Sequence, residues 1–229
     1  MRKRLPWIIG GVVVLAAVLF VGGPFVYIHF IEPDPAPKLT LDPGSSSAAP
    51  VTGGSDISGT WQPAAGSTFQ YRVHENLMGQ DNEATGTTTE VSGSMVVSGS
   101  TIQSVEITVP MGKVSSDENR RDQQFKGRIM NVSQFPNATF KLTAPVTLPS
   151  VPTDNSAITV NATGDLTVHG TTKSVTVALN AKRDGASIRV QGEIPVTFSD
   201  YGISSPSFAD ITVDDSGTIE LLVVFSKAS

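Results

Sequence analysis

The chain contains no cysteine among its 229 residues, and histidine is scarce, with three copies. The missing cysteine excludes disulfides, thiolate zinc sites, thiol catalysis and a lipidated cysteine. His29 lies in an apolar N-terminal run, so only His74 and His169 remain for a folded site, far apart in the sequence and without a Gly-x-Ser-x-Gly elbow. We therefore predict no metal site, no cofactor and no enzyme. The rival hypothesis of an enzyme acting on a lipid phosphate depends on these two histidines.

The chain also lacks an excess of positive charge. Its formal net charge is −5, and the part from Thr60 onward carries 12 Lys and Arg against 17 Asp and Glu, which is again −5. Nucleic-acid binding needs a basic footprint. The composition therefore predicts no nucleic-acid partner.

One long stretch near the N-terminus has no charged side chain. Residues 7–31 contain no Asp, Glu, Lys or Arg, and Arg2, Lys3 and Arg4 precede them. Such a run can span a bilayer, and the preceding positive charges place the N-terminus in the cytoplasm. The alternative is a cleaved signal peptide, whose apolar region is only about 7–15 residues long. We predict a single-pass protein of the cell membrane with a cytoplasmic tail at 1–6, an anchor at 7–31 and an extracytoplasmic remainder.

Residues 32–58 are rich in proline, serine and glycine and show no apolar periodicity. Prolines keep a chain extended, whereas Gly and Ser loosen it. We expect a linker here that lifts the following domain off the bilayer.

From residue 59 to 229 the pattern changes to alternation of apolar and polar residues. Alternating runs stand at 69–73, 159–168, 175–179, 188–198 and 219–225. A period of two with one apolar face is typical of half-buried strands, and Asp184-Gly185 between two such runs is a hairpin signal. About eight antiparallel strands close into a barrel or split into a sandwich. An eight-stranded barrel can enclose one small ligand.

One segment interrupts the alternation. Ser115 and Glu118 have the spacing of a capping box, with Ser115 as the N-cap. Phe125 and Ile129 then follow at helical spacing. This predicts one short helix from Arg120 to Met130, lying between strands.

Four motifs in this order resemble the YceI-like family of lipid- and polyisoprenoid-binding domains over about residues 60–227. They are Arg-Asp-Gln-Gln-Phe at 121–125, Gln-Phe-Pro-Asn-Ala-Thr-Phe at 134–140, Gly-Asp-Leu-Thr-Val-His-Gly-Thr-Thr-Lys at 164–173 and Asp-Tyr-Gly-Ile at 200–203. Tyr-Arg-Val-His-Glu at 71–75 and Gly93-Ser94 look like a membrane-anchored actinobacterial branch of that family.

This resemblance implies an all-β fold, a lipocalin-like eight-stranded antiparallel β-barrel with an apolar tunnel, preceded here by a transmembrane helix. It also implies an isoprenoid ligand of the polyprenyl or prenyl-quinone type and residence outside the cytoplasm, and it supplies no catalytic residue. The chain departs from commoner members of the family by its uncleaved anchor and by an enlarged polar loop at Gly79–Thr89.

The aromatic residues of the alternating face are the candidates for lining the tunnel, although plain core packing would use them equally. They are Tyr71, Phe125, Phe135, Phe140, Phe198 and Phe225. Arg120 and Arg121 are candidates for a headgroup contact, because a guanidinium suits phosphate oxygens. The alternative for these arginines is local pairing with a nearby acid.

The sequence therefore predicts a membrane-anchored, extracytoplasmic binding protein for a long apolar lipid. The alternative is a cell-envelope interaction or structural module with a filled barrel and no ligand. Whether the domain forms a homodimer is left open.

Overall fold

The structure is a computed structural model that describes residues 34–41, 56–77, 79–151, 156–204 and 211–228. The predicted anchor at 7–31 lies outside these residues. Within the described ranges, no helix combines the length and the apolar character needed to cross a membrane.

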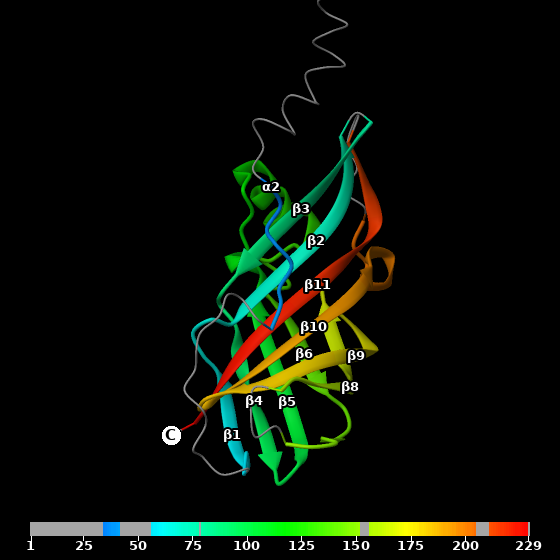
Figure 1. The fold of residues 1–229 in the computed structure, drawn as a ribbon. Coiled ribbons are helices and arrows are strands. Elements are labelled where there is room, and N and C mark those ends of the chain that lie inside the picture. Colours follow the sequence, from blue (N-terminus) through cyan, green and yellow to red (C-terminus); the bar gives the residue numbers. More distant parts are fainter. Residues whose placement is uncertain (1–33, 42–55, 78, 152–155, 205–210, 229) are drawn as a thin grey trace, which may run out of the picture.

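Eight antiparallel strands form a closed ring (Figure 1). Each strand pairs with the next in the order β1, β4, β5, β6, β8, β9, β10 and β11, and pairing of β1 with β11 closes the barrel. Their bounds are β1 Gly59–Pro63, β4 Ser92–Ser98, β5 Thr101–Pro110, β6 Asn137–Leu142, β8 Ile158–Val168, β9 Thr171–Asp184, β10 Ser187–Thr197 and β11 Ile211–Lys227. The predicted all-β, eight-stranded antiparallel barrel is confirmed.

The longest strand, β11, has two different neighbours along one edge. Its last residues pair with β1, while residues from Ile211 to Leu222 pair with β2 (Thr68–Leu77). Strand β3 (Gln80–Thr88) completes a hairpin with β2, and the short β7 (Val146–Thr147) pairs with β5. The β2–β3 hairpin thus extends the barrel wall beyond the point where β1 ends (Figure 1).

The expectation of a polar loop at Gly79–Thr89 is wrong, because most of this segment is strand β3. Its residues pair with β2 from Leu77↔Gln80 to Phe69↔Thr88. The segment has too few apolar side chains to show an alternating pattern, yet main-chain hydrogen bonds to β2 do not need them. A Cβ at Gly86 would overlap the ring of Tyr71, which lies against this strand.

The predicted short helix is present, with a different start. Helix α2 spans Asn119–Gln124, and a π-helical turn, η2, continues it over Phe125–Ile129. Ser115 is not the N-cap, because it is held extended by a bridge to Thr87. The Glu118 side chain caps the helix instead and accepts a hydrogen bond from the Arg120 amide at 2.9 Å.

The predicted hairpin at Asp184-Gly185 is confirmed, since β9 ends at Asp184 and β10 begins at Ser187. Gly185 has φ of +60°, a conformation that glycine adopts without strain. His169 lies in the turn between β8 and β9, as expected, and its Nδ1 is 3.2 Å from the carbonyl oxygen of Tyr201 in η3 (Phe198–Tyr201).

Part of the predicted linker contacts the barrel. Residues 34–41 run along the outer face of β2 and β11 (Figure 1). At the other end of the linker, Ile57 is 5% exposed and belongs to the barrel core.

Candidate functional site

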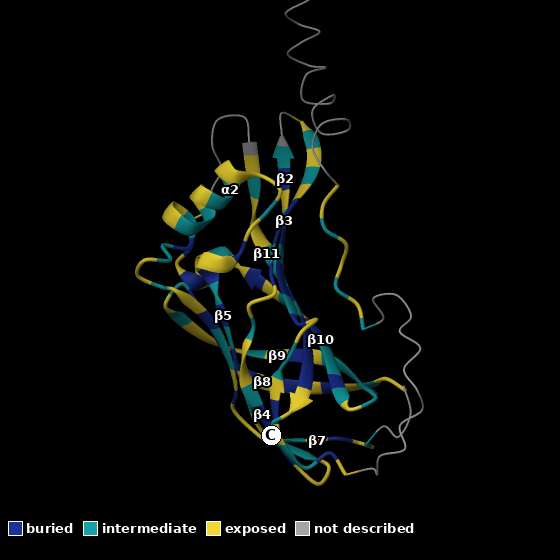
Figure 2. Ribbon diagram, turned by 90° about the vertical axis from the view of Figure 1, so that its left-hand side faces the viewer, coloured by how far each residue is buried: buried dark blue, intermediate teal, exposed yellow. Residues whose placement is uncertain are grey.

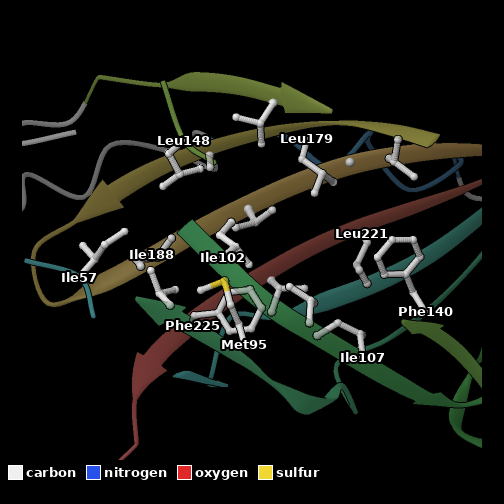
Figure 3. Close-up of a pocket in the computed structure, with 18 of the residues that line it drawn as sticks. Ile57, Met95, Ile102, Ile107, Phe140, Leu148, Leu179, Ile188, Leu221 and Phe225 are labelled. Atoms are coloured by element: carbon white, nitrogen blue, oxygen red, sulfur yellow. The ribbon is translucent and has the colours of Figure 1, made fainter. Parts of the chain in front are cut away.

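An apolar cavity of about 110 Å³ lies inside the barrel. Alternate residues of β10 and β11 form one side of it, because successive side chains of a strand point to opposite faces. These residues are Ile188, Val190, Gly192 and Ile194 on β10, and Leu221, Val223 and Phe225 on β11. Figure 3 shows Ile188, Leu221 and Phe225 of this side together with lining residues of the facing strands.

The facing strands and two loops complete the lining with further apolar side chains. They are Val160 on β8, Val177, Leu179 and Ala181 on β9, Met95 and Val97 on β4, Ile102, Val105 and Ile107 on β5, Phe140 on β6, and Ile57 and Leu148 from the segments that flank β1 and β7. Every side chain that lines the cavity in the described part of the chain is apolar. The site can therefore hold an apolar group.

One glycine helps to keep the space open. A Cβ at Gly192 would lie 2.6 Å from Cδ2 of Leu179 across the β9–β10 pair. Any larger residue would push Leu179 toward the cavity. The alternation of β10 therefore places a residue without a side chain directly beside Leu179.

Two of the six predicted lining aromatics, Phe140 and Phe225, line the cavity (Figure 3). Phe225 is 2% exposed. Phe198 packs against the core from η3 and is not among the lining residues. The lining residues that the prediction missed are aliphatic, such as Val177 and Val190, and the alternating pattern that revealed the strands also marks them.

The other three aromatics form two contacts away from the cavity. Tyr71 and Phe125 stack with ring centroids 4.9 Å apart and planes inclined by 15°, which joins β2 to η2. Burial raises the pKa of Tyr71 well above its usual range. Phe135 meets the ring of His169 edge-on at 4.7 Å and covers Gly170, so it fixes the β8–β9 turn.

The two candidate headgroup arginines also lie outside the cavity lining. Arg121 forms ion pairs with Asp117 and, at 3.4 Å, with Glu75. These contacts match the alternative that Arg121 pairs with nearby acids. Arg120 is exposed at the start of α2, a helix without a buried residue (Figure 2). The charge of Arg121 is thus largely balanced by its neighbours.

The two histidines lie apart and have different surroundings. His74 is exposed on β2, with Nδ1 3.5 Å from Asp214 Oδ2, whereas His169 packs in the β8–β9 turn. In the part of the chain that the structure describes, no three His, Asp or Glu side chains gather as a metal site would require.

Comparison with known proteins agrees with this architecture. The family model for the YceI-like domain matches residues 40–225. The chain belongs to the YceI-like family. The match begins inside the predicted linker, at Thr40, and ends within β11, at Phe225.

Two solved structures resemble the YceI-like chain in fold. One is a polyisoprenoid binding domain from Saccharophagus degradans implicated in plant cell wall breakdown, with 13% identity and a TM-score of 0.60, covering 74% of this chain and 99% of that one. The other is BcnA of Burkholderia cenocepacia, with 19% identity and a TM-score of 0.57, covering 70% and 96%. A search of curated proteins gives no match. At these identities the likeness establishes the shared barrel.

Proposed function

We propose that this protein binds an isoprenoid lipid inside its barrel and holds it at the outer surface of the cell membrane. The observation that carries the proposal is the cavity, whose lining side chains are all apolar. The similar domain from Saccharophagus degradans is described as polyisoprenoid binding, which supports the same ligand class by analogy.

Burial alone supplies the affinity in such a site. Each buried CH₂ group contributes about 0.8 kcal/mol, so one five-carbon isoprene unit contributes roughly 4 kcal/mol before the costs of association. No specific polar contact is required. This is why the binding site carries no polar or charged signature in the sequence.

The cavity must widen to take a long chain. Its volume of about 110 Å³ is close to that of an engineered cavity of about 150 Å³ that binds benzene. A ligand of several isoprene units therefore displaces lining side chains, and the flexible Met95 and the neighbouring leucines are suited to such movement. A structural module with a filled barrel, the alternative function, would have no use for this space.

An uncharged headgroup fits the protein better than a phosphate. Arg121, Glu75, Asp117 and Asp122 all lie near the Tyr71 hydroxyl, and Glu75 and Asp117 pair with Arg121. A diphosphate brought to this end of the barrel would meet these acids. We therefore favour a prenyl quinone over a polyprenyl phosphate.

Membrane anchoring and an extracytoplasmic location are part of the proposal. The uncharged run at 7–31 and the three basic residues before it support both. The binding role needs no catalytic group, and the absence of an enzymatic activity stays a prediction.

Native mass spectrometry tests the binding function. The domain from residue 34 onward is exported from a bacterial host, purified without detergent and measured before and after incubation with prenyl quinones. We expect a discrete added mass that organic extraction identifies as an isoprenoid. A protein that stays without ligand after incubation with both quinones and polyprenyl phosphates would refute the proposed function.

A further inference from the structure

The linker segment at residues 34–41 is held to the outside of the barrel by main-chain hydrogen bonds. Ala36 donates its amide to Thr85 Oγ1 at 3.1 Å, and its carbonyl accepts from Arg72 Nη2 at 2.6 Å. The carbonyl of Pro37 accepts from Gln70 Nε2 at 3.2 Å, and the amide of Leu39 donates to Glu220 Oε2 at 3.0 Å. We call residues 34–41 the strap.

The strap lies on a polar cluster that is buried although it faces outward. Leu221 and Val223 of β11 line the cavity, so Glu220, the residue directly before Leu221, points to the outer face. Glu220 and Gln70 are each only 1% exposed. A buried carboxylate and amide are costly without partners, and the strap supplies some of those partners.

Hydrogen bonds between the side chains of the cluster also fix their positions. Glu220 Oε1 accepts from Arg72 Nε at 2.7 Å, and Glu220 Oε2 accepts from Gln70 Nε2 at 3.0 Å. Arg72 donates further to Glu83 Oε2 at 2.7 Å. Arg72 and Gln70 on β2 therefore hold their donor groups in fixed positions, and Glu220 on β11 holds an acceptor oxygen in the same way. Groups that are fixed before binding lower the cost of binding an extended main chain.

The sequence of the strap suits this recognition. Pro35 and Pro37 favour an extended conformation and leave their carbonyl groups free to accept hydrogen bonds. The amides of Ala36 and Leu39, which are used as donors, are not proline. The strap therefore loses less conformational freedom on docking than a Gly/Ser segment would.

The N-terminal side of the strap lies toward the α2 end of the barrel. Ala36 contacts Thr85 and Arg72, toward the β2–β3 turn and α2, and Leu39 contacts Glu220 nearer the middle of β11. In Figure 1 the strap is the blue segment that starts beside α2, at the end of the barrel opposite β1 and the C-terminus, and runs down across β2 and β11.

We propose that the strap shortens the tether and turns the α2 end of the barrel toward the membrane, an inference that rests on the proposed anchor at 7–31. With the strap docked, only the five residues from Glu32 to Ala36 separate the anchor from its first contact, a reach of at most about 17 Å. Without docking, the free chain would extend to Ile57 in the core, a reach of at most about 90 Å. Docking of the strap therefore removes most of the reach of the linker and clamps the barrel close to the anchor, so the linker does not act as a long spacer.

A pair of matched insertions in the full-length chain tests this geometry. One variant carries about ten Gly/Ser residues between Glu32 and Pro33, and the other carries the same insert between Ser46 and Ser47, beyond the strap. Each insert adds roughly 17 Å to a free chain. The chain has no cysteine, so Gln123→Cys on exposed α2 accepts a single donor dye. Energy transfer is measured to acceptor-labelled lipid in phosphatidylethanolamine/phosphatidylglycerol vesicles.

We expect the insert before the strap to reduce the energy transfer and the insert after it to leave the transfer at the wild-type level. Equal reductions by the two inserts would overturn the clamp and leave the anchor intact. An absence of transfer in every variant would overturn the anchor and the clamp together.

Amide hydrogen exchange supplies a second measurement that does not need the membrane. The Leu39 amide is bonded to Glu220, whereas the amide of the adjacent Thr40 makes no hydrogen bond with the described part of the chain. We expect Leu39 to exchange at least tenfold more slowly than Thr40, relative to their unstructured rates. Equal exchange at the two positions would refute docking, whether or not the anchor spans the bilayer.

Discussion

A larger side chain at a lining position should fill the cavity and prevent lipid binding, while the barrel stays folded. Val177 on β9 is 3% exposed, lines the cavity and lies near Gly192 and Leu179. Val177→Phe adds four carbons in the space that a ligand would occupy. At about 0.8 kcal/mol per buried carbon, the displaced ligand atoms correspond to about 3 kcal/mol, or roughly a hundredfold weaker binding.

The neighbouring position provides the matched control. Ala178 is exposed and points to the outer face of the same strand, so Ala178→Phe adds a ring that never meets the cavity. A ring that enters existing space should cost less than the roughly 1–3 kcal/mol typical of overpacking a filled core. We therefore expect both variants to unfold within a few degrees of the wild type.

The assay is quenching of tryptophan fluorescence by a prenyl quinone. Trp61 is 3% exposed within the barrel core, and Trp7→Phe removes the other tryptophan. Val177→Phe should show no saturable quenching at concentrations that saturate Ala178→Phe and the parent protein. Tight binding by Val177→Phe, or equal loss in both variants, would refute the assignment of the cavity as the ligand site.

Three further predictions follow from the surrounding residues. Arg121→Gln should change the dissociation constant for a prenyl quinone less than twofold in the same assay, because Arg121 pairs with Asp117 and Glu75 outside the cavity. A tenfold loss of affinity would place the headgroup at this arginine. Gly170→Ala should lower the melting temperature more than Gly185→Ala, because both glycines have positive φ but only at Gly170 would a Cβ strike the Phe135 ring. The two variants should differ by about 1–3 kcal/mol in the free energy of unfolding. Equal effects of the two substitutions would contradict this packing. Burial raises the pKa of both Tyr71 and Tyr201, so ultraviolet titration of a Tyr27→Phe variant should show less tyrosinate near pH 10 in the folded barrel than in the unfolded chain. Because the folded pKa values lie above the unfolded ones, stability is complete below pH 10 and falls as the pH rises further; normal ionisation at pH 10 without unfolding would disprove the burial.

The strands could be predicted from the sequence because one face of each is apolar. The run from Ile188 to Ile194 alternates cleanly, and its inward residues line the cavity as the pattern indicates. Strand β3 escaped prediction, because its residues are polar on both faces and its pairing depends on main-chain hydrogen bonds to β2. The residue pattern of β3 alone does not indicate that it will pair with β2.

The aromatic residues were less informative than the aliphatic ones. Phe140 and Phe225 reach the cavity, while Tyr71 and Phe125 stack on each other and Phe135 packs on a turn. Spacing along a strand tells which face a side chain occupies, but not how far along the barrel axis it lies. The strap could not be predicted either, because its contacts use the main-chain carbonyl groups of Ala36 and Pro37 and the amides of Ala36 and Leu39. Any residue has such a carbonyl group, and any residue except proline has such an amide.

The pairing of β1 with the end of β11 has a consequence for how the protein reaches its native state. Trp61 and Lys227 are register partners although 166 positions separate them. Closing so long a loop is entropically costly, and folds dominated by such distant pairings fold slowly. Until β11 has emerged and paired, β1 and β10 each lack a neighbour and leave an open edge that other chains could join. Folding of this protein is therefore expected to depend on protection of those edges until the last strand arrives.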